Sequence, residues 1–164
     1  MVPNAGKSVD DPRWLADEML GRLARYLRFL GYDTAYARGI DDPAIAERAL
    51  REGRILVTRD RALAGRVPES ILVASPELSE QLKTVKRAYP ALRTQVRFER
   101  CTLCNGMLQS RDSSELTPLA IPDAVRSSGV PIYRCGECGH LYWEGSHTAE
   151  IRRRMTEWFG STPA

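Results

Sequence analysis

Residues 54–60 read Arg54-Ile-Leu-Val-Thr58-Arg59-Asp60, and they are the clearest indication of the fold. Its unbroken apolar run predicts a strand buried on both faces, as in a parallel sheet. Outward from it, the sequence predicts strands at 13–16, 32–37 and 71–74 and helices at 18–30, 43–52, 61–65 and 76–88. Strands that alternate with helices indicate an α/β fold in which helices cover both faces of a parallel sheet.

Acidic residues follow three of these strands. Asp17 comes after the first strand, Asp41 and Asp42 after the second, and Asp60 after the third. Because the carboxyl ends of parallel strands meet at one edge of a sheet, we expect these carboxylates to converge there. Close carboxylates need a cation, and Mg²⁺ or Mn²⁺ is the natural one. The alternative is local: Asp42 as a helix cap and Asp60 as a turn former.

Four cysteines in the second half form two Cys-x-x-Cys pairs, Cys101/Cys104 and Cys135/Cys138, separated by 30 residues. This spacing is typical of a closed tetrahedral Zn²⁺ site, which holds structure and performs no chemistry. Glycines at 106, 136 and 139 suit the tight turns of such a site. The alternative, two disulfides, is typical of secreted domains. The sequence shows no signal peptide, so we expect a zinc-binding protein of the cytoplasm.

The sequence pattern changes after residue 89. We expect residues 1–11 to form a flexible leader, 12–95 an α/β domain that ends in a linker, and 96–164 a small zinc-binding domain with a final helix at 146–159. No apolar run approaches the ~20 residues of a membrane-spanning helix, so we expect no membrane partner.

The formal net charge of +3 belongs to the first part of the chain, and nearly all of its basic residues are arginines. Arg22, Arg25 and Arg28 recur at three-residue steps on the helix after Asp17, and Arg59 and Arg61 flank Asp60. The planar guanidinium group suits phosphate, so we expect these five arginines to bind the phosphate groups of a substrate. The alternative for the helix arginines is an ordinary solvated face.

Several stretches of the chain resemble the Mut-seven C-terminal ribonuclease domain, a branch of the PIN-like nucleases. The stretches that carry the resemblance are Trp14-Leu-Ala-Asp17-Glu-Met-Leu-Gly-Arg-Leu-Ala-Arg25, Asp41-Asp42, Glu52-Gly-Arg-Ile-Leu-Val-Thr-Arg-Asp60-Arg61, Arg100-Cys101-x-x-Cys104-Asn-Gly and Cys135-x-x-Cys138-Gly-His. The resemblance extends from Trp14 to about Met155.

This resemblance implies a PIN-like three-layer α/β/α fold with a parallel sheet, followed by a small zinc ribbon. It also implies metal-dependent, endonucleolytic hydrolysis of RNA phosphodiester bonds. By position, the metal-binding catalytic acids would be Asp17, Asp42 and Asp60, with Asp41 as a rival to Asp42. PIN nucleases usually have a fourth acid after the fourth strand; here that region reads Ser75-Pro76-Glu77, which leaves the fourth ligand open with Glu77 as a candidate. The five arginines would then bind the RNA, which could be tRNA, rRNA or the ribosome.

Other functions stay open at this point. The chain could be an RNA- or ribosome-binding module that keeps a PIN-like fold with little or no catalytic turnover. It could also be a DNA nuclease, because an acidic cluster acts on phosphate and not on the sugar. A PIN toxin controlled by an antitoxin is a further alternative, although such toxins usually lack an appended zinc ribbon.

Overall fold

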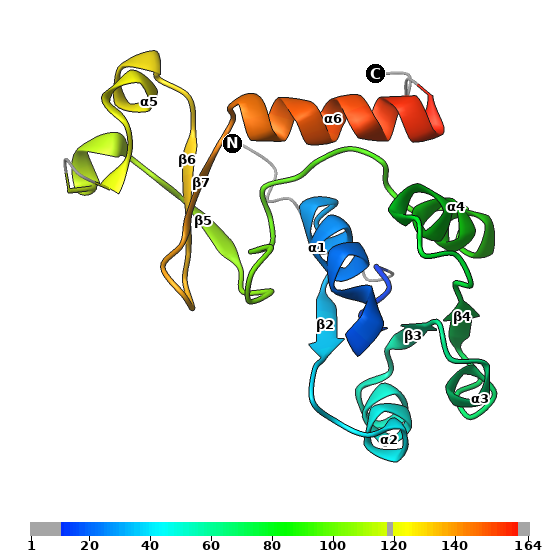
Figure 1. Cartoon of the computed structure of the whole chain (residues 1–164). Helices are drawn as coiled ribbons and strands as arrows, with labels where there is room; N and C mark the ends of the chain where they lie inside the picture. The colour runs from blue at the N-terminus through cyan, green and yellow to red at the C-terminus, as the bar shows by residue number, and fades with distance from the viewer. Residues whose placement is uncertain (1–10, 118–119, 161–164) are drawn as a thin grey trace.

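The structure is a computed structural model that describes residues 11–117 and 120–160 (Figure 1). The predicted flexible leader therefore lies outside the described residues, apart from Asp11. Among the described residues, none of the helices has the length and apolar character that crossing a membrane requires.

Four parallel strands form the first sheet, in the order β2-β1-β3-β4. They are β1 (Trp14–Asp17), β2 (Thr34–Ala37), β3 (Ile55–Thr58) and β4 (Ser70–Leu72). The central strand β1 pairs Ala16 with Tyr36 of β2 and with Val57 of β3, and all four of its residues are buried. The α/β fold class and the parallel sheet predicted from the sequence are thus confirmed.

Helices connect these strands, as the sequence predicts. Their bounds are η1 (Glu18–Leu20), α1 (Gly21–Phe29), α2 (Asp42–Glu52), α3 (Arg61–Ala64) and α4 (Leu78–Ala88). The helix predicted at 18–30 begins as a 3-10 turn and becomes α-helical only at Gly21. α2 ends at Gly53, whose φ of 57° is the left-handed conformation that favours glycine.

Two hydrophobic cores form on opposite faces of the sheet. Trp14 and Ala16 of β1 contribute to the core beneath α1 and α4, whereas Leu15 contributes to the core beneath α2 and α3. This alternation follows from the two-residue period of a strand. Both faces of the first sheet are therefore covered by helices, which leaves the ends of the strands as the accessible part of the sheet.

The second half contains a three-stranded antiparallel sheet in the order β5-β6-β7. Its elements are β5 (Leu108–Arg111), η2 (Ser113–Glu115), α5 (Asp123–Ser128), β6 (Ile132–Cys135), β7 (Leu141–Trp143) and α6 (Ser146–Phe159). The bounds of α6 agree with the predicted final helix. No sequence pattern predicts α5, because six mostly polar residues show no helical periodicity.

The final helix α6 packs against the first half of the chain, as Figure 1 shows. Its buried Ile151 and Met155 belong to the same core as Leu27 of α1 and Leu82 of α4. The Trp158 ring lies 5.8 Å from the Tyr26 ring. The division between residues 95 and 96 stays a prediction, but this helix shares its core with the α/β part.

Candidate metal centre and acidic sheet edge

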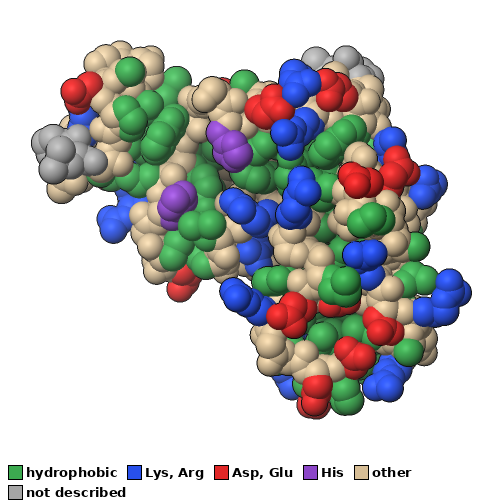
Figure 2. Space-filling model, in the orientation of Figure 1, with side chains coloured by type: hydrophobic (Ala, Val, Ile, Leu, Met, Phe, Trp, Pro, Cys, Tyr) green, Lys and Arg blue, Asp and Glu red, His purple; other side chains and the backbone are tan. Residues whose placement is uncertain are grey.

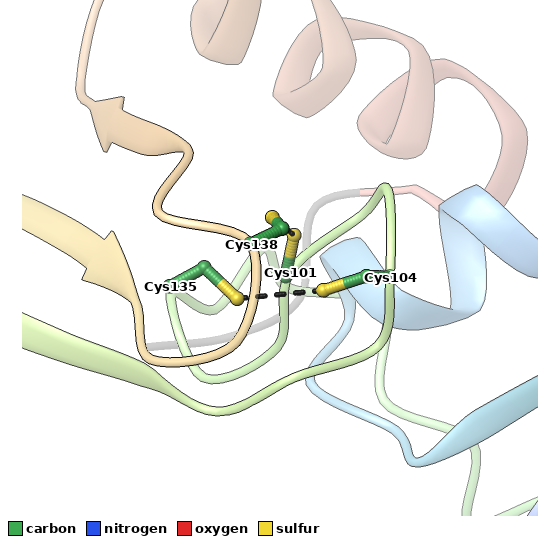
Figure 3. A group of neighbouring side chains, drawn as sticks. All are labelled: Cys101, Cys104, Cys135 and Cys138. Carbon is green, nitrogen blue, oxygen red and sulfur yellow. Dashed lines mark hydrogen bonds between the residues drawn. The ribbon is translucent and has the colours of Figure 1, made fainter.

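Four cysteine side chains converge on one point in the second half of the chain (Figure 3). Their sulfur atoms all lie within 4.8 Å of one another, and no disulfide joins them. The Cys101 and Cys138 sulfurs are 3.6 Å apart, and those of Cys104 and Cys135 are 3.4 Å apart. In a tetrahedral zinc site with Zn–S bonds of ~2.3 Å, the sulfurs are ~3.8 Å apart. The four cysteines can therefore hold a metal ion, and their chemistry fits zinc.

Tight turns place the cysteines of each pair. In the first pair, Asn105 adopts a left-handed φ of 70° and its backbone N–H donates to Cys101 O at 2.9 Å. Gly106 is needed for space rather than for its φ, because a Cβ there would lie 2.8 Å from the Cys135 sulfur. In the second pair, Gly139 has the left-handed φ of 75° that the sequence suggests for it. These turns bring the sulfurs together from loops and strand ends that are far apart in sequence.

The thiol groups of this cluster differ in acidity. Burial raises the pKa of Cys101, but hydrogen bonds from the Tyr142 hydroxyl and the backbone of the same turn outweigh it and lower the pKa to about 7. Burial raises the pKa of Cys104 to about 12, and the neighbouring sulfurs add to this rise. Four thiols this close cannot all ionise unless a cation neutralises them. A divalent metal that binds thiolates supplies that cation.

The carboxyl ends of β1 and β3 carry two of the predicted acids, joined by a threonine. Asp17, only 8% exposed, accepts a hydrogen bond of 2.6 Å from the Thr58 hydroxyl through Oδ2. The backbone N–H of Asp60 donates to the same hydroxyl oxygen at 2.9 Å. Sequence reasoning did not single out Thr58, although it is the polar residue that ends the apolar run of β3. The Thr58 hydroxyl therefore holds Asp17 and the backbone of Asp60 next to each other at this edge.

The second strand brings Asp41 and Asp42 to the same edge. Asp41 is the N-cap of α2, and its carboxylate accepts from Ala44 N at 2.9 Å. The sequence placed this cap at Asp42, one residue too late. Asp42 is instead the first residue of the helix, and within the described residues its carboxylate makes no hydrogen bond or ion pair. Of the two rivals, Asp42 has the carboxylate that is not engaged in capping.

We call Asp17, Asp41, Asp42 and Asp60 the acidic edge. Among residues 11–117 and 120–160, the four cysteines are the one group of three or more potential ligands close enough together to hold a metal ion. The acids therefore share an edge of the sheet, as topology requires, but do not converge to metal-binding distance. The reason is that Asp17, Asp41 and Asp60 each accept a backbone N–H at the start of a helix. Glu77 precedes α4, is exposed and makes no such capping bond.

Four of the five predicted RNA-binding arginines are available to a ligand. Arg22, Arg25 and Arg61 are exposed and Arg59 is half-buried. In the part of the chain that the structure describes, none of their four side chains makes a hydrogen bond or an ion pair. Arginines elsewhere are commonly paired. Examples are the pairs Arg48–Glu52, Arg97–Glu99 and Arg153–Glu150.

The fifth arginine, Arg28, has a different environment. It is only 6% exposed, and its guanidinium group donates to Thr34 O at 2.9 Å, Thr102 O at 3.0 Å and Leu103 O at 3.1 Å. At about 3.6 residues per turn, two three-residue steps turn Arg28 about 120° away from Arg22 around the helix. Arg28 therefore does not share the exposed face of Arg22 and Arg25. It connects α1 and β2 to the first cysteine turn.

A second polar connection runs through Asn105. Its side chain accepts from Thr34 N at 2.9 Å and donates to Asp33 Oδ1 at 2.8 Å. Burial raises the pKa of Asp33, but hydrogen bonds from Arg54 and Asn105 outweigh it and lower the pKa below its usual value. These bonds fix the metal centre against the amino end of β2, at the opposite end of the sheet from the acidic edge.

Comparison with known proteins gives one match. The sequence model described as the Mut7-C RNAse domain matches residues 12–155. No curated protein and no solved structure matches the chain significantly. The matched range includes all four cysteines, the whole acidic edge and the five arginines.

Proposed function

The chain belongs to the Mut7-C RNAse domain family, and from this premise we propose that it is a metal-dependent ribonuclease. In this proposal it has a PIN-like three-layer fold with a zinc ribbon, and it hydrolyses RNA phosphodiester bonds at the acidic edge. Family membership supports a ribonuclease-related role and an RNA substrate. The carboxylates of the acidic edge and the nearby arginines support the more specific proposal of metal-dependent hydrolysis at this edge.

The observation that carries the proposal is the link between Asp17 and Asp60 through Thr58. The Thr58 hydroxyl at the end of β3 donates to the Asp17 carboxylate and accepts from the backbone N–H of Asp60, so the two acidic residues are held near each other. We propose that they hold Mg²⁺ or Mn²⁺, with Asp42 and then Asp41 as further ligands. A bound ion of this kind lowers the pKa of a coordinated water and polarises a phosphate. The ligands would have to approach one another when the ion binds.

The arginines support a phosphate substrate. Arg59 and Arg61 flank Asp60, and Arg22 and Arg25 lie on the helix that follows Asp17, all without an acidic partner among the described residues. Figure 2 shows basic side chains gathered over and beside α1 on one face, with acidic side chains below them toward α2. A polyanion lying across this face would neutralise the arginines and bring its phosphates close to the acids.

The second candidate is an RNA-binding module with little or no turnover, and one observation favours it. Three of the four edge acids already accept hydrogen bonds at helix starts, and no group at this edge is compact enough for a metal in the described residues. Acids that only cap helices would leave the arginines able to bind RNA and nothing to cut it. The two candidates differ in one property, which is turnover that depends on the acids.

The test is cleavage of end-labelled RNA by zinc-loaded protein with Mn²⁺, with Mg²⁺ or with EDTA. Wild type is compared with Asp17→Asn, Asp60→Asn and the double variant. Asparagine caps helices about as well as aspartate, so these changes remove charge and keep the fold. Asp112→Asn is the matched control, because Asp112 also caps a 3-10 turn but lies in the ribbon.

The ribonuclease proposal expects internal cleavage that requires the metal ion, falls ~10²-fold or more in the acid variants and is unchanged in Asp112→Asn. Structured tRNA and rRNA fragments beside unstructured RNA would identify the preferred substrate. RNA that is bound but never cut, with every metal, would establish the binding module instead. We also propose a cytoplasmic location, since four free thiols fit a reducing compartment.

A further inference from the structure

A pocket lies where the metal-binding part meets the α/β part. Its volume is about 370 Å³, within the range of ~300–1,000 Å³ that small-molecule sites occupy. Residues from α1, the first cysteine turn, β7 and the start of α6 line it. They include Arg25, Phe29, His140, Tyr142, Trp143 and His147. We call this cavity the junction pocket.

Aromatic rings stand on two sides of the junction pocket. On the helical side, the Phe29 and His147 rings lie 6.1 Å apart in an edge contact. On the side of the ribbon, the His140 and Tyr142 rings lie 4.8 Å apart, and the half-buried Trp143 adds an indole. Rings held in this way present faces and edges to any flat group that enters.

The metal centre fixes the ribbon side of the junction pocket. The Tyr142 hydroxyl lies 3.1 Å from the Cys101 sulfur and accepts from Thr102 N at 3.1 Å. The Thr148 hydroxyl donates to Trp143 O at 3.3 Å, which ties β7 to the start of α6. This side of the pocket is therefore held in place by the cysteine cluster, and it requires little ordering when a ligand binds.

The charge of the pocket favours an anion. No carboxylate lines it, and the guanidinium group of the exposed Arg25 has neither a hydrogen bond nor an ion pair among the described residues. The 14-residue helix α6 begins at the pocket with no acidic residue in its first turn and no side-chain cap on its first N–H groups. An unpaired guanidinium beside aromatic rings suits a ligand that combines a flat ring with a phosphate.

We propose that the junction pocket binds one unpaired nucleotide of a single-stranded RNA, with its base against the rings and its phosphate at Arg25. This inference rests on the proposed RNA substrate and adds where and in what form the RNA is held. Arg25 and Arg22 lie on α1, the helix that leads from the acidic edge to the pocket. The basic side chains seen over α1 in Figure 2 lie between the two histidines and the acidic group.

An unpaired nucleotide is favoured over a base pair for a geometric reason. A base inside an A-form duplex is stacked on both sides, so it cannot enter a pocket without leaving its stack. An unpaired base exposes both faces and an edge, and stacking on protein rings tolerates any base. The junction pocket thus selects for loops, ends or unstructured stretches of RNA rather than for a particular sequence.

The first experiment measures binding of a short, fluorescently labelled single-stranded RNA in EDTA, at a concentration that leaves the structural zinc bound, so that cleavage plays no part. Fluorescence anisotropy is recorded for wild type, Trp143→Leu and Arg25→Gln. The matched control is Arg66→Gln. The Arg66 side chain is also exposed and has no hydrogen bond or ion pair within the described chain, but it lies between α3 and β4, and β4 is at the other edge of the sheet from β2.

We expect Trp143→Leu to bind about tenfold more weakly, in line with the loss of one stacked base. Arg25→Gln should reduce the slope of log K against log salt concentration by about 0.7, the contribution of one phosphate in a single strand. Arg66→Gln should bind as wild type, and a fully paired duplex should bind less tightly than the single strand. Equal affinity of wild type, Trp143→Leu and Arg25→Gln for the single strand would overturn the proposal.

A second experiment changes the RNA, so that protein folding cannot affect the answer. One abasic site is moved through the single strand, one position at a time. The proposal expects one position, or a narrow set of positions, where removing the base lowers the affinity of wild type about tenfold and leaves the affinity of Trp143→Leu unchanged. The same loss with both proteins would show that the base is bound elsewhere.

These outcomes are separable from the fate of the ribonuclease proposal. Base-dependent binding at the pocket in a protein that never cuts RNA would support the pocket and contradict the nuclease. Cleavage that depends on Asp17 and Asp60, with Trp143→Leu and Arg25→Gln binding and cutting as wild type, would support the nuclease and overturn the pocket.

Discussion

The metal centre and the acidic edge are built from similar numbers of ligand-type residues, but they are prepared to different degrees. The four cysteine sulfurs lie within 4.8 Å of one another, and tight turns with special backbone conformations hold them there. Three of the four edge acids are engaged in capping helices, and their carboxylates stay apart. The cysteines are held by local turns, so their sulfur atoms are already close enough together to bind a metal ion. The acids are held only by the ends of different strands, so their carboxylates would have to approach one another when a cation binds.

The largest effect should come from removing one cysteine of the metal centre. We expect Cys101→Ser or Cys138→Ser to lose the metal and to unfold residues 96–145, because a structural zinc contributes on the order of 10 kcal/mol to such a unit. Zinc content and circular dichroism measure both effects. Ser110→Ala, an exposed change on β5, is the control. Full zinc occupancy and an unchanged spectrum in the cysteine variants would show that the cluster does not hold this region together.

The next effect concerns Thr58, the hydroxyl that joins Asp17 to Asp60. We expect Thr58→Val to reduce cleavage by roughly tenfold or more, because the two acids lose their common partner. The same change should lower the free energy of unfolding by about 1–2 kcal/mol. Thr34→Val is the matched control, since Thr34 is equally buried but lies at the amino end of β2. Equal activity in the two threonine variants would remove Thr58 from the site.

These variants also mark what the sequence could and could not predict. The apolar run at Ile55–Thr58 and the Cys-x-x-Cys spacing are local signals, and both led to correct predictions. Thr58 was missed because its importance depends on the register of β1 against β3, which no local pattern shows. Whether the acids at one edge of the sheet contact one another depends on the paths of the loops between strand and helix. Their common location at the carboxyl ends of the strands does not determine the distances between their carboxylates.

The arginines show the same limit. Residues three positions apart lie close to the same face of a helix, but each further step of three rotates the side chain away from that face. After two such steps from Arg22, the Arg28 side chain lies in the interior. Two of the three carbonyl groups that Arg28 binds, those of Thr102 and Leu103, lie more than seventy residues away in the chain, so no local pattern indicates them. The helix cap was predicted at Asp42 instead of Asp41 because either residue satisfies the local rule.

A third prediction tests the connection between the two regions. We expect Arg28→Leu to lower the free energy of unfolding by about 2–4 kcal/mol, because three carbonyl groups lose a charged donor, two of them in the first cysteine turn. Urea unfolding measures this loss. Arg22→Leu, an exposed change on the same helix, should shift stability by no more than about 0.5 kcal/mol. Similar losses in both variants would mean that the buried contacts of Arg28 contribute little.

The smallest effect is a pH dependence at Asp33. Its folded-state pKa is lowered, so ionised Asp33 adds stability above its unfolded pKa of about 4, and this stability is lost as pH falls through the lower folded value. The difference in stability between wild type and Asp33→Asn should therefore be constant near neutral pH and shrink as the pH falls below about 4. Asp123→Asn, an exposed acid on α5, is the control. A difference that stays constant down to the lowest pH would contradict the lowered pKa.

The measurement that tests the central claim most directly is Mn²⁺ binding to the zinc-loaded protein, followed by electron paramagnetic resonance with and without uncleavable RNA. We predict that wild type binds Mn²⁺ more tightly than Asp17→Asn and Asp60→Asn do, and that RNA widens this difference because its phosphate completes the coordination. Asp112→Asn should bind as wild type. Equal Mn²⁺ binding by wild type and both edge variants, with RNA present, would contradict the claim that the acidic edge is a metal site.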